Sequence, residues 1–343
     1  SRSNLWMSIS VCFSHHSLFS MAPSGFPHHL IMDSRDFCEV LLASLAHRYT
    51  KLTGNLMTEL RSRESLLLAV STKIPTFALT QHGKTNKGEK MISKARIRLI
   101  HALEMRKHRL REGLFVAEGP RLVGEMLRSV SPAYLAATDD WFAENRHLLC
   151  GKLATDVVSE SELRQASLLR TPQQVLALCP LPQYDLDTAL PQHQLCLALD
   201  GVQDPGNMGT IVRIADWFGI TEIFCSNDTA DAFNPKVVQA TMGSIARVSI
   251  RYVNLSEMLS TLPDGFPVYG TFLDGEDIYQ QTLSDEGLII MGNEGNGISH
   301  EVGRLINRRL LIPNFSTSED RAESLNVAIA TAITCSEFRR KRK

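Results

Sequence analysis

The stretch "LCLALDGVQDPGNMGTIVRIADWFG", residues 195–219, contains the two elements that decide the fold. Its opening residues are almost all apolar, which is typical of a buried strand. Its second half has the i, i+3, i+4, i+7 spacing of a helix with one apolar face, at Ile211, Ile214, Ala215 and Phe218. Gly219 then ends the helix, as glycine often does. The stretch therefore predicts a strand, a short polar loop and a helix.

The same alternation continues from residue 194 to the end of the chain. We expect strands at 195–200, 221–226, 246–253, 267–273, 287–291 and 309–312. We expect helices at 207–218, 235–243, 255–262, 299–307 and 324–338. Strands that alternate with helices form a mainly parallel sheet with helices on both faces, so residues 194–343 are predicted to be an α/β domain. Ligands of such sheets bind at the carboxyl ends of the strands.

Three further parts precede this domain. Residues 91–180 also alternate between helix and strand patterns, beginning with a helix over 93–111, and predict a small α/β domain. Residues 181–193 contain two prolines and no period, and are expected to be a linker. Residues 1–90 hold six of the eleven histidines and lack a sustained period. We expect them to be a disordered leader or a start-site artefact.

Composition limits the class of protein. The chain has 343 residues, of which 43% are hydrophobic and 21% charged, and its net charge of −1 gives no global attraction to nucleic acid. The seven cysteines occur singly without CxxC spacing, so we expect buried free thiols and a cytoplasmic location. No run approaches the ~18 apolar residues of a membrane helix, so no membrane partner is expected.

Arg213 is the residue of the opening stretch that packing does not explain. It lies with Thr210 and Trp217 on the side of the helix opposite the apolar face, while Asn207 is expected to cap the helix. In one interpretation Arg213 pairs with Asp216, three residues further on. In the other, its guanidinium projects into a cleft and holds a phosphate or a reacting oxygen.

Two more loops follow predicted strands. "GNEGNGIS", residues 292–299, has three glycines that let a backbone approach a ligand closely. Its glycine order is not that of a dinucleotide-binding loop, and Glu294 is either a helix-capping carboxylate or an active-site anion. The last loop leads into "ESLNVAIATAITCSEFRR", in which Ser324 is expected to cap the helix. Asn326 would then lie inside the helix, where Asn is unfavourable unless its amide has a specific partner.

Together, the three loops resemble the signature of the SpoU–TrmH family of RNA ribose 2′-O-methyltransferases, within the SPOUT class. The matching stretches are "DPGNMGTIVRIA", "IIMGNEGNGIS" and "LIPN…ESLNVAIA". Residues 91–180 resemble the family's small RNA substrate-binding domain. The resemblance implies S-adenosylmethionine as the methyl donor, a trefoil knot formed by the C-terminal segment, and a homodimer whose active site draws on both subunits.

The resemblance also implies the site residues. It places the catalytic arginine at Arg213 and the other motif residues at Asn207, Glu294, Ser324 and Asn326. The cofactor contacts that it implies are Thr271, Phe272, Leu273, Gly292, Asn293, Gly295, Ile312 and Leu325. The segment "NFSTSEDRAE" is longer than in the family and lacks glycine, so the geometry of 314–322 is not carried over. Methyl transfer from a sulfonium requires no metal, and none is expected.

RNA also has to be held outside the active site. From Lys94 to Arg111 there are seven Lys or Arg against one Glu, which predicts a basic surface helix. The expected RNA contacts are Lys94, Arg96, Arg106, Lys107, Arg109 and Arg111. The tail "FRRKRK" is either a further RNA contact or a solubilising tail. The substrate is expected to be rRNA or tRNA, and the N-terminal module favours rRNA.

Other functions are less consistent with these residues. A related knotted enzyme could methylate a base, but the Asn…Arg of the first motif and the "SLN" of the third favour ribose. A catalytically silent RNA-binding or assembly factor would not need Arg213, Glu294, Ser324 and Asn326 together. A nucleotide-dependent oxidoreductase would carry its glycine loop elsewhere. The acidic run "DGED", residues 274–277, is expected to be a polar turn and not a metal site.

Overall fold

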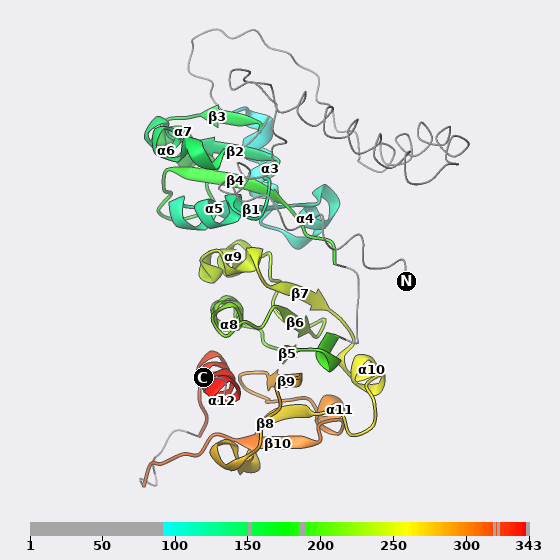
Figure 1. Cartoon of the computed structure of the whole chain (residues 1–343). Helices are drawn as coiled ribbons and strands as arrows, with labels where there is room; N and C mark the ends of the chain where they lie inside the picture. The colour runs from blue at the N-terminus through cyan, green and yellow to red at the C-terminus, as the bar shows by residue number, and fades with distance from the viewer. Residues whose placement is uncertain (1–91, 150–152, 185–189, 318–319, 321–322, 341–343) are drawn as a thin grey trace, which may run out of the picture. The chain divides into compact units, whose positions relative to one another are not determined.

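The structure is a computed structural model that describes residues 92–149, 153–184, 190–317, 320 and 323–340. The leader expected at 1–90 lies outside the described residues. The described chain contains a four-stranded sheet followed by a six-stranded sheet (Figure 1).

The first sheet belongs to a small α/β domain. Its strands are β1 (Leu114–Glu118), β2 (Tyr134–Ala137), β3 (Thr155–Val157) and β4 (Val175–Pro180). Its helices are α3 (Lys94–Ala102), α4 (Arg106–Glu112), α5 (Pro120–Leu127), α6 (Asp139–Asn145) and α7 (Glu160–Ala166). The strand order is β1-β4-β2-β3, with β4 antiparallel to both neighbours and β2 parallel to β3.

The basic segment of this domain forms two helices, so the prediction of one helix over 93–111 is wrong. Ser93 caps α3, and α4 ends at Gly113 in the left-handed conformation that favours glycine. Leu103, between the two helices, is fully buried. The chain turns at this point, and Arg109 donates hydrogen bonds to Leu103 O and Glu104 O, two carbonyls of the turn.

The second sheet is entirely parallel, with the strand order β10-β8-β9-β5-β6-β7. Its strands are β5 (Leu195–Asp200), β6 (Glu222–Cys225), β7 (Ser249–Tyr252), β8 (Val268–Asp277), β9 (Gly287–Gly292) and β10 (Arg308–Leu311). Its helices are α8 (Pro205–Trp217), α9 (Pro235–Thr241), α10 (Leu255–Ser260), α11 (His300–Gly303) and α12 (Val327–Arg339). The predicted α/β fold with a parallel sheet is confirmed.

Helices cover both faces of this sheet (Figure 1). Alternate residues of a strand point to opposite faces, and β5 divides in this way between two apolar clusters. Leu195, Leu197 and Leu199 pack with residues of α8, α9 and α12. Cys196 and Ala198 pack with residues of α10 and α11. Burial on both faces explains why β5 is a continuous apolar run.

Several predicted boundaries are wrong. Residues 274–277 are the end of β8, because Leu310 and Leu311 of β10 pair with Glu276 and Asp277. They are therefore not a turn. A side chain at Gly275 would come within 2.5 Å of the Leu310 backbone, so glycine permits this pairing. Strand β7 starts at Ser249 because a short 3-10 helix, η4 (Ser244–Ala246), occupies the residues before it.

The cysteines that the structure describes are free and buried: Cys179, Cys196, Cys225 and Cys335. Burial raises the pKa of the Cys179, Cys196 and Cys335 thiols to about 12, so they stay protonated and unreactive. Within the described segments, no helix is both long enough and apolar enough to cross a membrane.

Candidate active site

The three loops singled out in the sequence meet beyond the carboxyl ends of parallel strands. They follow β5, β9 and β10, and β5 pairs directly with β9. Asp200, the last residue of β5, is 7% exposed and accepts a hydrogen bond from Ser299 N at 2.7 Å. This carboxylate joins the first loop to the second. Asp200 was not among the expected site residues, because an aspartate at the end of a strand has no distinctive sequence pattern.

The first loop ends at the start of α8. Asp204 is the N-cap, and its side chain accepts a hydrogen bond from Asn207 N at 2.8 Å, while Pro205 takes the first helical position. The prediction that Asn207 caps this helix is therefore wrong. Because Asp204 performs the capping, the Asn207 side chain is left to bond other loops.

Glu294 of the second loop binds the start of α8. Its carboxylate accepts hydrogen bonds from Gln203 N at 3.3 Å, Asp204 N at 3.2 Å and Asn207 Nδ2 at 3.0 Å. Burial alone would raise the pKa of Glu294, but the hydrogen bonds from Asn207, Gln203 and Asp204 outweigh it and lower the pKa. Glu294 is thus an ionised carboxylate that joins the second loop to the first.

Asn326 of the third loop completes this network. Its Oδ1 accepts from Ala328 N at 2.9 Å and from Ile329 N at 3.3 Å, which makes it the N-cap of α12. Its Nδ2 donates to Asn207 Oδ1 at 2.9 Å. The prediction that Ser324 caps a helix beginning at 324 is wrong, because Asn326 caps one beginning at Val327. A hydrogen-bonded chain Glu294–Asn207–Asn326 therefore links all three loops.

A hollow of about 400 Å³ opens beside this chain. Residues from β8, from the second loop and from the third loop line it. All eight expected cofactor contacts are among them: Thr271, Phe272, Leu273, Gly292, Asn293, Gly295, Ile312 and Leu325. The residues expected from the sequence did not include Met291, Ile298, Leu311 or Ala330, which also line the hollow. Ser324 lies on the lining as well.

Glycines allow the second loop to fold back on itself. A side chain on Gly292 would come within 2.3 Å of the Gly297 backbone, since Asn293 and Gly297 form a β-bridge there. Asn293 Oδ1 accepts from Gly295 N at 2.9 Å, and its Nδ2 donates to Gly201 O at 2.6 Å. The loop therefore curls back on itself and holds the wall of the hollow, so Asn293 is a structural residue as well as a lining one.

Arg213 lies in a different hollow. It is six residues after Asn207 on α8, or about 9 Å along the axis, and on another side of the helix. It lines a second hollow of about 810 Å³ and is not among the residues of the first. Its suggested partner Asp216 bonds Arg247 instead, at 2.7 Å, so the interpretation of Arg213 as a simple surface ion pair is wrong.

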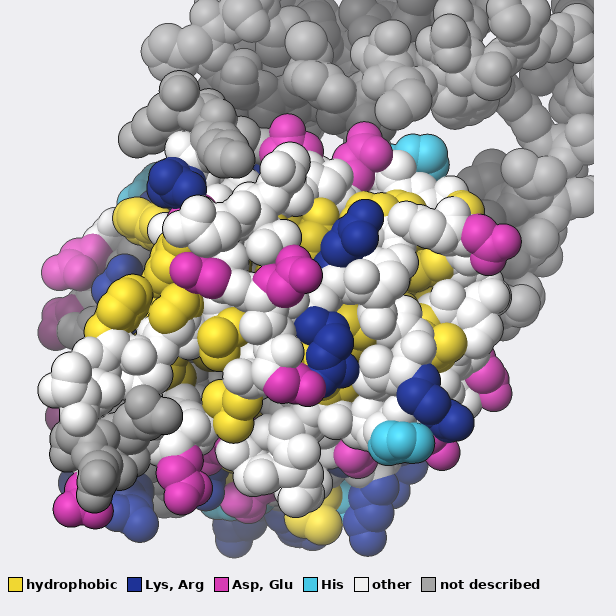
Figure 2. Space-filling model, turned by 90° about the horizontal axis from the view of Figure 1, so that it is seen from below, with side chains coloured by type: hydrophobic (Ala, Val, Ile, Leu, Met, Phe, Trp, Pro, Cys, Tyr) yellow, Lys and Arg dark blue, Asp and Glu magenta, His cyan; other side chains and the backbone are white. Residues whose placement is uncertain are grey.

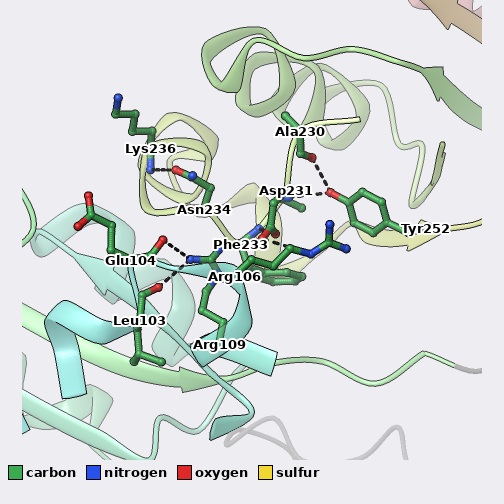
Figure 3. Close-up of polar contacts among 11 residues, drawn as sticks. Leu103, Glu104, Arg106, Arg109, Ala230, Asp231, Phe233, Asn234, Lys236 and Tyr252 are labelled. Atoms are coloured by element: carbon green, nitrogen blue, oxygen red, sulfur yellow. Dashed lines mark hydrogen bonds and ion pairs between the residues drawn. The ribbon is translucent and has the colours of Figure 1, made fainter. Parts of the chain in front are cut away.

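Arg109, one of the six expected RNA contacts, is inside the protein. It is 2% exposed, and its guanidinium donates to Leu103 O and Glu104 O, both at 2.7 Å, and to Asp231 Oδ2 at 2.5 Å (Figure 3). Asp231 lies between β6 and α9. The prediction that Arg109 contacts RNA is corrected, because this side chain is used to hold α4 against the second sheet's domain.

The other five expected RNA contacts differ in exposure and in whether they are already bound to an acidic side chain. Arg96 is bound to Asp156 at 2.8 Å and stacks over Tyr134, and Arg106 lies 3.8 Å from Asp231 and over Tyr252 (Figure 3). Arg111 is exposed beside Glu112, at 2.8 Å. Lys94 and Lys107 are exposed, and no ion pair involves either within the described residues. These two lysines and Arg111 remain the best placed of the set for RNA.

Charge is mixed on the face drawn in Figure 2, where Lys and Arg side chains alternate with Asp and Glu and with apolar side chains. That face therefore presents no continuous basic surface of the kind that a nucleic-acid backbone requires.

Comparison with known proteins gives this geometry a family. The model of the SpoU rRNA Methylase family matches residues 194–336, and that of the MRM3-like substrate binding domain matches residues 94–177. The chain is 34% identical to the 23S rRNA (guanosine(2553)-2′-O)-methyltransferase RlmP of Bacillus subtilis (strain 168), over 67% of this chain and 90% of that protein.

Solved structures support the same family assignment. A putative RNA methyltransferase of the TrmH family from Porphyromonas gingivalis aligns with a TM-score of 0.67 and 42% identity, covering 74% of this chain and all of that one. An AdoMet-bound rRNA methyltransferase from Sinorhizobium meliloti aligns with a TM-score of 0.61 and 28% identity, covering 74% and 98%. The fold is that of the SPOUT class of methyltransferases. Within that class, the chain belongs to the SpoU rRNA methylase family.

Proposed function

We propose that this protein transfers a methyl group from S-adenosylmethionine to a ribose 2′-hydroxyl of RNA, with rRNA as the first candidate and tRNA as the second. The observation that carries the proposal is the Glu294–Asn207–Asn326 chain at the edge of an apolar, glycine-walled hollow. A relative that aligns over 90% of its length is named as an rRNA 2′-O-methyltransferase.

The first hollow fits the proposed methyl donor. Its volume of about 400 Å³ lies within the roughly 300–1,000 Å³ of small-molecule pockets. Leu273, Ile312 and Leu325 offer apolar contact. Such a donor supplies a sulfonium methyl, which is electrophilic without a metal.

The residues of the hydrogen-bonded chain Glu294–Asn207–Asn326 then have to orient a weak nucleophile. A ribose hydroxyl reacts slowly unless it is held in line with the methyl group and loses its proton. We assign Asn207, Asn326 and Ser324 to holding the ribose at the rim of the hollow. Glu294 is assigned to fixing Asn207 through the hydrogen bond at 3.0 Å.

Arg213 is assigned to the substrate. A guanidinium gives up its proton far less readily than other side chains, so it is a poor base, and its fork is suited to a phosphate. We therefore favour a phosphate clamp that orients the ribose, with the proton leaving to phosphate or water. The other assignment, in which Arg213 itself acts as the general base, requires it to lose a proton first.

The separation of Arg213 from the first hollow supports a homodimer. On α12, Ala330 lines the first hollow and Ala332 lines the second, and two helical residues are about 200° apart around the axis. Ile329 lies between them and is 52% exposed. A two-fold axis running roughly along α12 would bury Ile329 and would bring Arg213 of each subunit to the first hollow of the other.

Two further features belong to the same proposal. The segment after β10 lines the hollow together with 292–298, as it would in the expected trefoil knot. The four described cysteines are free, as expected in the reducing cytoplasm.

Mapping the methyl group tests the function. Purified protein would be incubated with 23S rRNA or tRNA and isotope-labelled S-adenosylmethionine, and the digested RNA would be analysed by mass spectrometry. We expect label on ribose, in 2′-O-methylnucleosides that protect the neighbouring phosphodiester from alkali. Label on a base would favour the base-methylating alternative. No label, together with no cofactor binding in titration calorimetry, would favour a silent RNA-binding factor.

A further inference from the structure

The second hollow has features that the proposed methyl transfer does not use. It lies between α5 of the small domain and α8, η4 and α12 of the large one, with a volume of about 810 Å³. Three guanidinium groups line it: Arg121, Arg213 and Arg247. Only Arg213 was expected to have a function.

The two carboxylates of this hollow are already neutralised. Arg247 bonds Asp216 at 2.7 Å and Glu125 at 3.1 Å, and Ser244 Oγ donates to Asp216 at 2.7 Å. Glu125 also pairs with Arg128 at 3.0 Å. Within the described part of the chain, neither Arg121 nor Arg213 has an acidic partner. The hollow therefore keeps two uncompensated positive groups.

The hollow is held in shape by close packing between the two domains. Gly243 has a φ of 101°, and a side chain there would come within 2.5 Å of Glu125 Cβ. Glycine thus lets α5 approach η4, where Arg247 reaches Glu125. Arg121 precedes Glu125 by one helical turn, so it lies on the same side of α5 and faces the hollow.

We propose that Arg121 and Arg213 together bind phosphates of the RNA backbone next to the methylated nucleotide, so that the small domain contributes directly to the reacting end of the substrate. This inference rests on the proposed function, since it takes RNA as the ligand. Two exposed guanidiniums in an open hollow suit phosphodiesters, which stay charged and accept forked hydrogen bonds. Trp217, which is 84% exposed in the same hollow, offers a face on which a neighbouring base stacks.

The variant Arg121→Gln tests the inference through binding alone. Affinity for radiolabelled 23S rRNA would be measured by filter binding over a range of salt concentrations, without a methyl donor. We expect affinity to fall roughly tenfold and the salt slope to decrease by about 1, the effect of one lost phosphate contact. Arg121→Lys keeps the charge and should restore most of the affinity. S-adenosylmethionine binding should not change, because Arg121 is not part of the first hollow.

Arg146→Gln is the matched control, since Arg146 is an exposed arginine of the same domain and lines neither hollow. The inference is overturned if Arg121→Gln binds 23S rRNA with the wild-type affinity and salt slope, or if the wild-type protein binds neither rRNA nor tRNA. It is also overturned if the variant weakens self-association in sedimentation but leaves RNA affinity unchanged, because the hollow would then belong to a protein contact. Weaker RNA binding by the variant in a protein that transfers no methyl group would reject the proposed function and leave the inference standing.

Discussion

At the scale of single residues, the site depends on side chains that each bond a different loop. Asn207 accepts from Asn326 through its Oδ1 and donates to Glu294 through its Nδ2. An amide is suited to this position because it carries both a donor and an acceptor. Either neighbour alone would leave half of that amide unsatisfied.

Arg213→Lys should separate substrate positioning from cofactor binding. Lysine keeps the charge but not the planar fork, so we expect turnover at saturating RNA and cofactor to fall by roughly a hundredfold. The affinity for S-adenosylmethionine should stay unchanged in calorimetry, because Arg213 does not line that hollow. Arg304→Lys, at an exposed arginine that lines neither hollow, is the control and should keep wild-type turnover. A near-normal rate for Arg213→Lys would reject both roles proposed for Arg213.

Glu294→Gln should remove a pH-dependent contribution to stability. Hydrogen bonds outweigh burial and hold the pKa of Glu294 below its ordinary value, so its ionised form is favoured in the folded state. That contribution is present above the unfolded pKa of about 4.3 and is lost as the pH falls through the folded pKa. Urea titrations at several pH values should show the wild type more stable at neutral pH, by about 1 kcal/mol. The difference should shrink in acid, and one that did not vary with pH would contradict the assignment.

At the scale of elements, the sequence predicts which helices and strands exist better than it predicts the residues at which they begin and end. The five helices and six strands expected for the large domain are all present, and burial on both faces of the sheet leaves its strongest apolar pattern in β5, β6 and β9. The boundaries of α12 and β8 could not be predicted. They depend on a cap that also bonds Asn207, and on the pairing of Leu310 and Leu311 with the end of β8. The strand pairing is a tertiary contact with no local pattern, and Ser324 and Asn326 are both of residue types that cap helices.

The same limit applies to the site. Glycine, Asn and Glu in the strand-end loops indicated the residues that meet there. A count of Lys and Arg, however, does not show which of them are exposed, and Arg109 is an example. Its neighbours Lys107 and Arg111 are exposed, whereas Arg109 is buried against Asp231. Asp231 is distant in the chain and belongs to no recognisable pattern.

Asn326 allows the cap of α12 to be tested separately from the link to Asn207. Asn326→Asp keeps an oxygen for Ala328 N and Ile329 N but cannot donate to Asn207. We expect it to keep the cap, to lose the hydrogen bond to Asn207 and to lose activity. Asn326→Ala should lose activity too, and in addition about 1 kcal/mol of stability in urea unfolding. Full activity of Asn326→Asp would show that the Asn326–Asn207 hydrogen bond is not needed for the reaction.

At the scale of the whole molecule, the described chain has two separate hollows, and the proposed reaction needs residues from both. The hollow that fits the cofactor and the hollow that holds Arg213 lie on opposite sides of α12. Methyl transfer requires that the methyl donor and the groups that orient the ribose act on the same nucleotide. In the homodimer that we propose, a second subunit placed over Ile329 would satisfy that requirement.

Mixed dimers test this claim most directly. Arg213→Ala would remove the guanidinium, and Leu273→Arg would block the cofactor hollow at a residue that is 78% exposed, so the core is not disturbed. Each variant alone should be inactive, and calorimetry should show that only the first binds S-adenosylmethionine. Co-expression with two affinity tags isolates the dimer that contains one of each. If Arg213 acts across the interface, one of its two sites is intact, and we predict about half the wild-type turnover. No activity in that mixed dimer would contradict a site shared between subunits and would show that Arg213 acts within its own subunit.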